Sequence, residues 1–201
     1  MSVPRRIGVD LDNTLVRYDH VFQRVAEERG LVETGAGASK LQIRDALRRS
    51  GRENVWVELQ GCVYGPNMRD AELFPGALEA MAQLRDRGHQ LFVISHRTLR
   101  PALGPPHDLH AAAREWIQRS LPSIDPARIY LETSREDKLR RIGQLACDLF
   151  VDDLPEVLLS TDFPAGTRRI LFDPEGDHRG NQTFSSVRTW SELARLIDEQ
   201  A

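Results

Sequence analysis

Five short apolar runs, separated by helical patterns, constrain the fold of this 201-residue chain more than any other feature. Each run is almost continuously apolar rather than alternating, which is typical of strands buried on both faces of a parallel sheet. The runs are RIGVD (6–10), QLFVIS (90–95), RIYLE (128–132), DLFVD (148–152) and RRILFD (168–173). They predict an α/β protein with a mainly parallel five-stranded sheet.

Helical patterns fill the intervals between these runs from residue 75 onward. The first begins with Pro75 and ends before Gly88, which are typical start and stop signals. Alternating strands and helices, joined by right-handed crossovers, predict a doubly wound, Rossmann-like core. The expected helices cover residues 75–87, 108–120, 136–146 and 191–199.

Residues 16–74 interrupt this alternation directly after the first run. Three apolar stripes at helical spacing occur there, around Val21, Leu41 and Val55. We therefore expect residues 16–74 to be a small helical domain, inserted into a core made of residues 1–15 and 75–201.

Charge and composition limit the possible binding partners and the expected compartment. The chain has 27 basic and 30 acidic residues, and the formal charge of −3 favours neither nucleic acid nor an anionic membrane. No apolar run approaches the roughly 20 residues that span a bilayer, and the first residues lack the apolar middle of a secretory signal. The two cysteines, Cys62 and Cys147, lie far apart, as suits a reducing compartment. We expect a cytoplasmic monomer or homodimer.

Pairs of carboxylates follow two of the predicted strands. Asp10 and Asp12 come after the first run, and Asp152 and Asp153 close the fourth. Ligands of open α/β sheets bind beyond the carboxyl ends of the strands, where these pairs converge if the two strands are neighbours. Such oxygen ligands suit Mg²⁺. A single Asp at such a position is usually a helix cap or a turn former. Two pairs at two strand ends favour a metal-binding role over that interpretation.

Two further positions complete a predicted phosphate pocket. Ser95 ends the second run, and its hydroxyl together with the following backbone N–H groups, from His96 onward, is suited to hold phosphoryl oxygens. Lys138, in the first turn of the 136–146 helix, brings a compact positive charge to the same edge. Taken singly, Ser95 is interpreted as a simple cap at a strand exit and Lys138 as a solvated side chain. Their predicted roles in binding phosphate therefore depend on their occurrence together with the strand-end carboxylates.

Four motifs follow one another along the chain: DLDNTL (10–15), Ser95, Lys138 and VDDLP (151–155). In this order they resemble the motifs of the haloacid dehalogenase superfamily of phosphohydrolases. The resemblance implies that Asp10 attacks phosphorus to form an aspartyl-phosphate. It also implies that Asp12 protonates the leaving group and then activates water, and that the insertion is a cap domain.

The same resemblance implies the remaining roles at the site. Thr14 and Ser95 would hydrogen-bond the phosphate, while Lys138 would offset its charge. Mg²⁺ would be bound by the side chains of Asp10 and Asp152 and by the main-chain carbonyl of Asp12, with Asp153 orienting its waters. Candidate contacts to the rest of the substrate lie in the loop after the second run and in the return from the insertion. They are Arg97, Arg100, His107 and Arg69.

The sequence thus predicts a Mg²⁺-dependent phosphatase of a small phosphorylated metabolite, with a sugar phosphate ranked ahead of a nucleoside monophosphate. A phosphomutase would use the same aspartyl-phosphate. A phospho-acceptor signalling domain shares the sheet and the acidic pair, but its pair belongs to the first strand and it has no insertion of this length. A binding module without catalysis remains an alternative, although every group needed for turnover is present.

Overall fold

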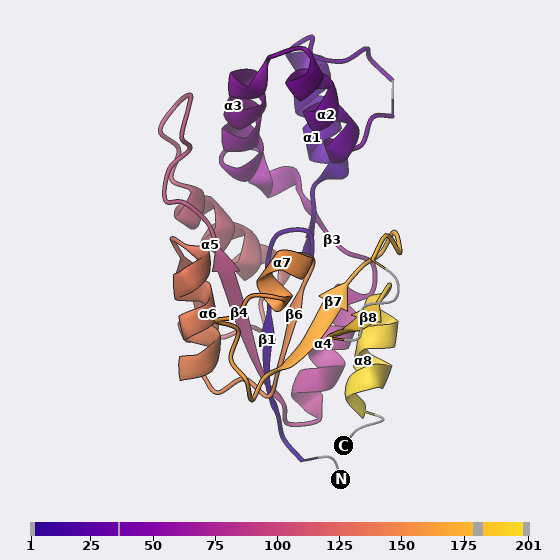
Figure 1. Cartoon of the computed structure of the whole chain (residues 1–201), viewed down its shortest axis with the longest axis vertical. Helices are drawn as coiled ribbons and strands as arrows, with labels where there is room; N and C mark the ends of the chain where they lie inside the picture. Colours follow the sequence, from indigo (N-terminus) through magenta and orange to yellow (C-terminus); the bar gives the residue numbers. More distant parts are fainter. Residues whose placement is uncertain (1–2, 36, 179–182, 199–201) are drawn as a thin grey trace. The chain divides into compact units, whose positions relative to one another are not determined.

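Six parallel strands form the central sheet (Figure 1) of a computed structural model that describes residues 3–35, 37–178 and 183–198. Every ladder between neighbouring strands of this sheet is parallel. The strand order reverses on the two sides of β1, as in doubly wound folds. In spatial order the strands are β5 (Ile129–Glu132), β4 (Gln90–His96), β1 (Arg6–Val9), β6 (Leu149–Asp152), β7 (Arg168–Phe172) and β8 (Ser185–Val187).

The α/β class and the parallel sheet are confirmed, and five strands lie where the apolar runs predicted them. The predicted number of five strands was wrong, because β8 adds a sixth at the sheet edge. This strand has the sequence Ser-Ser-Val, and only Val187 is buried. An edge strand needs no apolar run, so the pattern that marks the other strands is missing here.

Helices cover both faces of the sheet in the first of two compact units, which we call the sheet unit. It contains the described residues within Met1–Val16, Leu73–His96 and Ser120–Ala201. On one face, α6 (Arg135–Gln144) and α7 (Pro155–Leu158) pack against Phe92, Phe150 and Leu171. On the other, α4 (Ala77–Asp86) and α8 (Trp190–Asp198) pack against each other.

Local capping explains where α6 begins. The Ser134 hydroxyl accepts a hydrogen bond from the backbone N–H of Asp137 at 3.1 Å, which satisfies one of the free donors of the first turn. Leu139 and Ile142 then bury one face of the helix against the sheet. Lys138 lies in the same first turn and is fully buried, so the start of α6 delivers a lysine to the interior.

The second compact unit, the helical unit, contains the described residues within Arg17–Glu72 and Arg97–Arg119. Its core is aromatic: the rings of Phe22 and Trp56 stack at 5.2 Å, and Tyr64 meets Phe22 edge-on at 5.7 Å. A separate two-stranded sheet pairs β2 (Val16–Arg17) with β3 (Glu72–Leu73). The helices are α1 (Asp19–Glu28), α2 (Lys40–Arg49), α3 (Glu53–Tyr64), the 3₁₀ turn Met68–Asp70 and α5 (Leu109–Ser120).

The segment after β4 belongs to the helical unit because it packs closely on α3. A Cβ atom at Gly61 would lie 2.7 Å from Cβ of Pro101, and one at Gly65 would lie 2.9 Å from Cβ of His107. Only glycine permits backbones to approach this closely. The structure therefore groups residues 97–119 with residues 17–72, although they lie outside the predicted insertion of 16–74.

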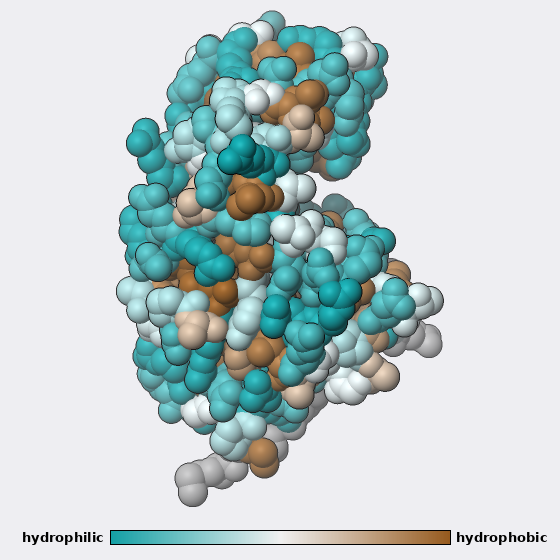
Figure 2. Space-filling view, turned by 90° about the vertical axis from the view of Figure 1, so that its left-hand side faces the viewer, coloured by the Kyte–Doolittle hydropathy of each residue, from teal (hydrophilic) through white to brown (hydrophobic). Residues whose placement is uncertain are grey.

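The surface drawn in Figure 2 is mainly hydrophilic, with small and separate apolar patches. The large apolar side chains that are most exposed include Val3, Leu41 and Leu99. Single exposed residues of this kind are ordinary for a folded protein. Both cysteines are free and buried. Among the described residues, none of the helices combines the length and the apolar character needed to cross a bilayer.

Candidate active site

Two carboxylates meet at the carboxyl edge of the sheet because β1 and β6 are direct neighbours. Val9 pairs with Val151, so Asp10 follows the end of β1 while Asp152 ends β6 beside it. The backbone N–H of Asp10 continues the ladder by donating to the Val151 carbonyl at 2.9 Å. This edge, next to the reversal in strand order, is where open α/β sheets bind ligands.

Lys138 joins these two carboxylates. Its Nζ lies 2.6 Å from Oδ1 of Asp10 and 2.7 Å from Oδ2 of Asp152. The second oxygen of Asp152 accepts a hydrogen bond from the backbone N–H of Leu154 at 3.0 Å. Asp10 is 4% exposed and the other two charged residues are fully buried. Two carboxylates against one ammonium leave this buried cluster with an excess of negative charge.

Burial and crowding change the proton affinities of the three groups. Burial raises the pKa of Asp10 to about 6; Lys138 opposes this shift, and the nearby carboxylates of Asp152 and Asp12 add to it. Burial likewise raises the pKa of Asp152. Burial disfavours charge on Lys138, yet the two carboxylates prevail and raise its pKa. The cluster therefore keeps its ammonium and favours a further cation.

The donor set fits a hard divalent ion. Asp10, Asp152 and Asp153 each offer a carboxylate oxygen, and these oxygens all lie within 4.8 Å of one another. Oxygen ligands, rather than sulfur or imidazole, are those that Mg²⁺ takes in proteins. Asp12 is outside this carboxylate group, and the role predicted for it at the metal uses its main-chain carbonyl. The residues that are present thus suit Mg²⁺.

The loop after β1 is tightly folded and presents a buried hydroxyl. The backbone N–H groups of Leu15 and Val16 both donate to the Leu11 carbonyl, at 3.0 and 2.9 Å. Asn13 has a φ of 58°, in the left-handed region that asparagine tolerates better than most residues. Oγ1 of Thr14 is buried and has no hydrogen-bond partner among the described residues, which suits a group that meets a ligand oxygen.

Ser95 and His96 lie at the end of β4, on the other side of β1 from Asp152. Ser95 is 1% exposed. Nδ1 of His96 is buried and has no hydrogen-bond partner among the described residues. Burial, reinforced by the charge of Lys138, lowers the pKa of His96, so its imidazole is neutral near pH 7. The three strand ends thus supply carboxylates, a hydroxyl and a neutral imidazole to one edge.

The four residues proposed as substrate contacts all lie in the helical unit. Arg97 is buried there: its guanidinium donates to the Tyr18 hydroxyl at 3.0 Å and to the Leu109 carbonyl at 3.2 Å. Arg100 is exposed. Arg69 and His107 line one cavity of about 390 Å³ on the α5 face. The structure therefore places Arg69 and His107 at one cavity, and Arg97 is buried within the helical unit.

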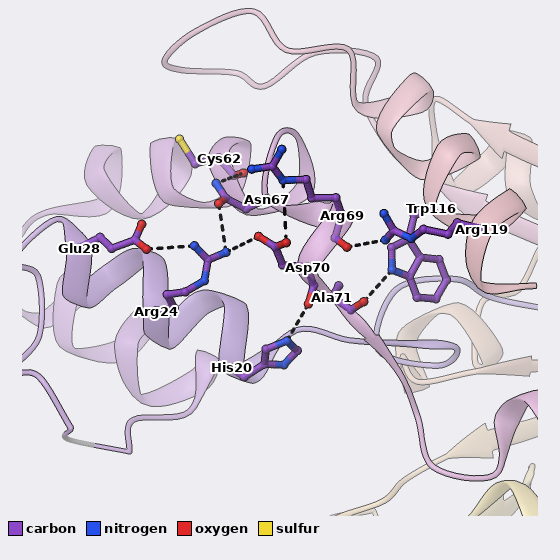
Figure 3. Close-up of polar contacts among 10 residues, drawn as sticks. All are labelled: His20, Arg24, Glu28, Cys62, Asn67, Arg69, Asp70, Ala71, Trp116 and Arg119. Carbon is purple, nitrogen blue, oxygen red and sulfur yellow. Dashed lines mark hydrogen bonds and ion pairs between the residues drawn. The ribbon is translucent and has the colours of Figure 1, made fainter.

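A polar network fixes the backbone around Arg69 (Figure 3). Arg24 donates to Oδ2 of Asp70 at 2.7 Å and to Oδ1 of Asn67 at 3.2 Å. The indole of Trp116 donates to the Ala71 carbonyl at 2.8 Å, and Arg119 donates to the Arg69 carbonyl. The side chain of Arg69 is 73% exposed and its Nε lies 3.9 Å from Oδ1 of Asp70, so its backbone is held while most of its guanidinium remains in solvent.

The sheet order is that of a doubly wound α/β fold, and solved structures, several of them named as haloacid dehalogenase hydrolases, share it. A "predicted phosphatase" from Clostridium acetobutylicum aligns with a TM-score of 0.64 and 14% identity, covering 98% of this chain and 100% of that one. A "putative HAD-hydrolase" from Bacillus subtilis, bound to magnesium, aligns at 0.61 with 12% identity and covers 98% and 100%. The chain has the haloacid dehalogenase fold, which confirms the fold implied by its motifs.

Two curated proteins are similar along almost their whole length. A "putative nucleotidase" from Oceanobacillus iheyensis is 26% identical over 195 residues, which is 94% of this chain and 96% of the relative. A second "putative nucleotidase", from Bacillus cereus, is 20% identical over 202 residues, covering 97% of this chain and 99% of the relative. No protein-family model matches the chain.

Proposed function

We propose that the chain is a phosphoric monoester hydrolase that uses Mg²⁺ and forms an aspartyl-phosphate on Asp10. The observation that carries this proposal is the buried cluster of Asp10, Asp152 and Lys138 at the carboxyl edge of the sheet. Buried charges are costly, and an excess of carboxylate is retained where it has a chemical task. The haloacid dehalogenase fold supports the same conclusion.

The residues divide the reaction into two displacements. A carboxylate oxygen of Asp10 forms a bond to phosphorus while the bond to the leaving oxygen breaks, and Asp12 gives its proton to that oxygen. A water then attacks phosphorus, Asp12 takes its proton, and inorganic phosphate leaves as the Asp10 carboxylate is restored. Lys138, Thr14 and Ser95 stabilise the phosphoryl oxygens throughout.

Mg²⁺ would be held by the carboxylates of Asp10 and Asp152 and the carbonyl of Asp12, with Asp153 beside them. When bound, it would offset negative charge on the phosphoryl group. Lys138 adds a second, fixed positive charge whose protonation is secured by the two carboxylates that it contacts.

The substrate is a small phosphomonoester, and a nucleoside monophosphate now ranks ahead of a sugar phosphate. The ground for this ranking is that the two curated relatives, which align with almost the whole chain, are named as nucleotidases. The cavity lined by Arg69 and His107 belongs to the helical unit, which we propose as the cap domain that selects the substrate.

A phosphate-release screen tests the proposal. Purified protein is given nucleoside monophosphates, sugar phosphates and an aryl phosphate, with Mg²⁺ or with a chelator. We expect Mg²⁺-dependent release that is fastest with nucleoside monophosphates and is absent in Asp10→Asn. Conversion of a sugar phosphate to its isomer without free phosphate would instead identify a phosphomutase. No turnover of any ester by the wild type would overturn the hydrolase.

A further inference from the structure

We propose that Trp190, the first residue of the C-terminal helix α8, positions the loop that holds Asp12 and Thr14. The inference rests on the proposed phosphatase function. Trp190 lies 176 residues from Thr14 in the sequence and outside all four superfamily motifs. It would act through the loop and not on the substrate, so it is a positioning residue.

The link is a single buried hydrogen bond. The indole Nε1–H of Trp190 donates to the main-chain carbonyl of Thr14 at 3.1 Å, and both residues are fully buried. A buried carbonyl that loses its donor is left without solvent to replace it. The bond therefore restrains the carbonyl side of the peptide after Thr14, whose N–H, that of Leu15, donates to the Leu11 carbonyl.

The loop's own backbone holds it at several points, including its middle, where the N–H of Asn13 donates to the Val16 carbonyl at 2.9 Å. The Thr14 carbonyl, in contrast, takes its donor from Trp190. Leu15 and Val16 donate to the Leu11 carbonyl, and the N–H of Phe74 donates to the Leu15 carbonyl at 2.9 Å. Between these anchors, Asn13 has a left-handed backbone, which is a strained conformation that surrounding contacts must maintain. The indole of Trp190 supplies such a contact from outside the loop.

Trp190 is itself held in place. Its ring lies 6.1 Å from that of Phe172, which meets Phe74 edge-on at 4.9 Å. At the other end of α8, Asp198 forms an ion pair with Arg87 at 2.5 Å. A donor fixed by packing on several sides can restrain the Thr14 peptide.

Movement of this peptide would displace the side chain of Thr14 directly. It would displace Asp12 through the one residue between them, Asn13. Asp12 must reach the leaving oxygen to transfer its proton, and a misplacement of about 1 Å can cost on the order of 100-fold in rate. Loss of the indole N–H should therefore slow the first displacement most for esters whose leaving group needs a proton. The second displacement is common to all esters, so the difference is expected in kcat/KM, which reports the first displacement.

The test compares two esters in Trp190→Phe, which removes the donor and keeps an aromatic ring. One is the alkyl phosphomonoester that the wild type hydrolyses fastest, and the other is p-nitrophenyl phosphate, whose leaving group needs no proton. We expect kcat/KM to fall about 10-fold or more for the alkyl ester and to fall far less for the aryl ester.

Trp116→Phe is the matched control. Trp116 is 1% exposed and its indole also donates to a backbone carbonyl, that of Ala71, but within the helical unit. We expect this variant to lose thermal stability while the ratio of kcat/KM values for the two esters stays that of the wild type. An unchanged ratio in Trp190→Phe, or the same shift in Trp116→Phe, would overturn the role of Trp190 and leave the phosphatase intact.

Two further outcomes are distinguishable. A wild type that hydrolyses neither ester would overturn the proposed function, and this inference with it. If Trp190→Phe does not fold, replacing the indole at position 190 by benzothiophene removes only the N–H at nearly constant size. A wild-type ratio of kcat/KM values in that protein would again overturn the inference, and a selective loss on the alkyl ester would support it.

Discussion

Charged side chains meet in both units of this protein, with opposite consequences. In the sheet unit, Lys138 and its partners Asp10 and Asp152 are at most 5% exposed in their side chains. In the helical unit, Arg24 and Asp70 form a pair of almost the same length, 2.7 Å, but their side chains are 40% and 43% exposed. Similar geometry thus occurs in two very different dielectric environments.

Charge balance is the second difference. In the helical unit Arg24 and Arg69 face Asp70 and Glu28, two cations against two carboxylates, and all four side chains are at least 40% exposed. In the sheet unit two carboxylates share one ammonium with hardly any water. Exposed pairs contribute little to stability, whereas an unbalanced buried cluster is costly unless a cation balances it. The first arrangement holds a backbone segment, and the second is where we propose that the reaction occurs.

Removal of Lys138 should produce the largest effect. Lys138→Met leaves two buried carboxylates without a cation, and we expect the free energy of unfolding to fall by about 3–5 kcal/mol. Chemical denaturation at pH 7.5 without Mg²⁺ measures it. The loss should shrink as the pH is lowered, because protonated carboxyls do not repel each other. A loss below about 1 kcal/mol, as for an exposed pair, would erase the contrast between the two units.

Asp10→Asn should separate stability from activity. Phosphate release should fall by about 1,000-fold or more, because the nucleophile is gone. In metal-free buffer at pH 7.5, however, the variant should be more stable than the wild type by about 1–3 kcal/mol, because the cluster becomes balanced.

The pH dependence of that gain follows from the pKa of Asp10. Its folded value of about 6 lies above the ordinary 3.8, so the wild type loses stability as the pH rises through 6. The advantage of Asp10→Asn should therefore be complete above pH 7 and vanish near pH 4. Equal stability of the two proteins at every pH would show that burial of Asp10 is not destabilising.

Addition of Mg²⁺ should stabilise the wild type by roughly 3 kcal/mol when the free ion exceeds its dissociation constant 100-fold. Thermal unfolding with increasing MgCl₂ measures this. Asp152→Asn should remove most of the shift, whereas Asp70→Asn, the matched change in the helical network, should leave it intact. A shift of equal size in both variants would indicate general ionic strength and not a site.

Much of the sheet unit could be predicted from sequence because its signals are local. A continuous apolar run indicates a buried strand. A charged residue at the end of that strand lies on the carboxyl edge of a parallel sheet, whatever the order of the strands in the sheet. This is why Asp10 and Asp152 were identified. Lys138 was identified separately, in the first turn of a predicted helix and as part of the motif set, and in the structure it contacts both carboxylates. The strand β8 was not predicted because an edge strand with two serines has no continuous apolar run.

Other features arise only from tertiary contact. Residues 97–119 join the helical unit because Gly61 and Gly65 let another segment approach α3, and neither glycine signals this in its local sequence. Arg97 was predicted as a substrate contact because it follows β4; the structure shows it buried, with its guanidinium donating to the Tyr18 hydroxyl. The bond from Trp190 to Thr14 links the two ends of the chain and has no sequence pattern at all.

The smallest effect is expected from the helical network. Arg24→Met removes bonds to Asp70 and Asn67, yet water can replace them, so we expect a loss of less than about 1 kcal/mol. Raising the salt concentration should shrink the difference from the wild type further, because exposed pairs are screened. Thermal unfolding at low and high salt measures both. A loss as large as that of Lys138→Met would mean that pairing, and not burial, sets the cost of losing a charge in this protein.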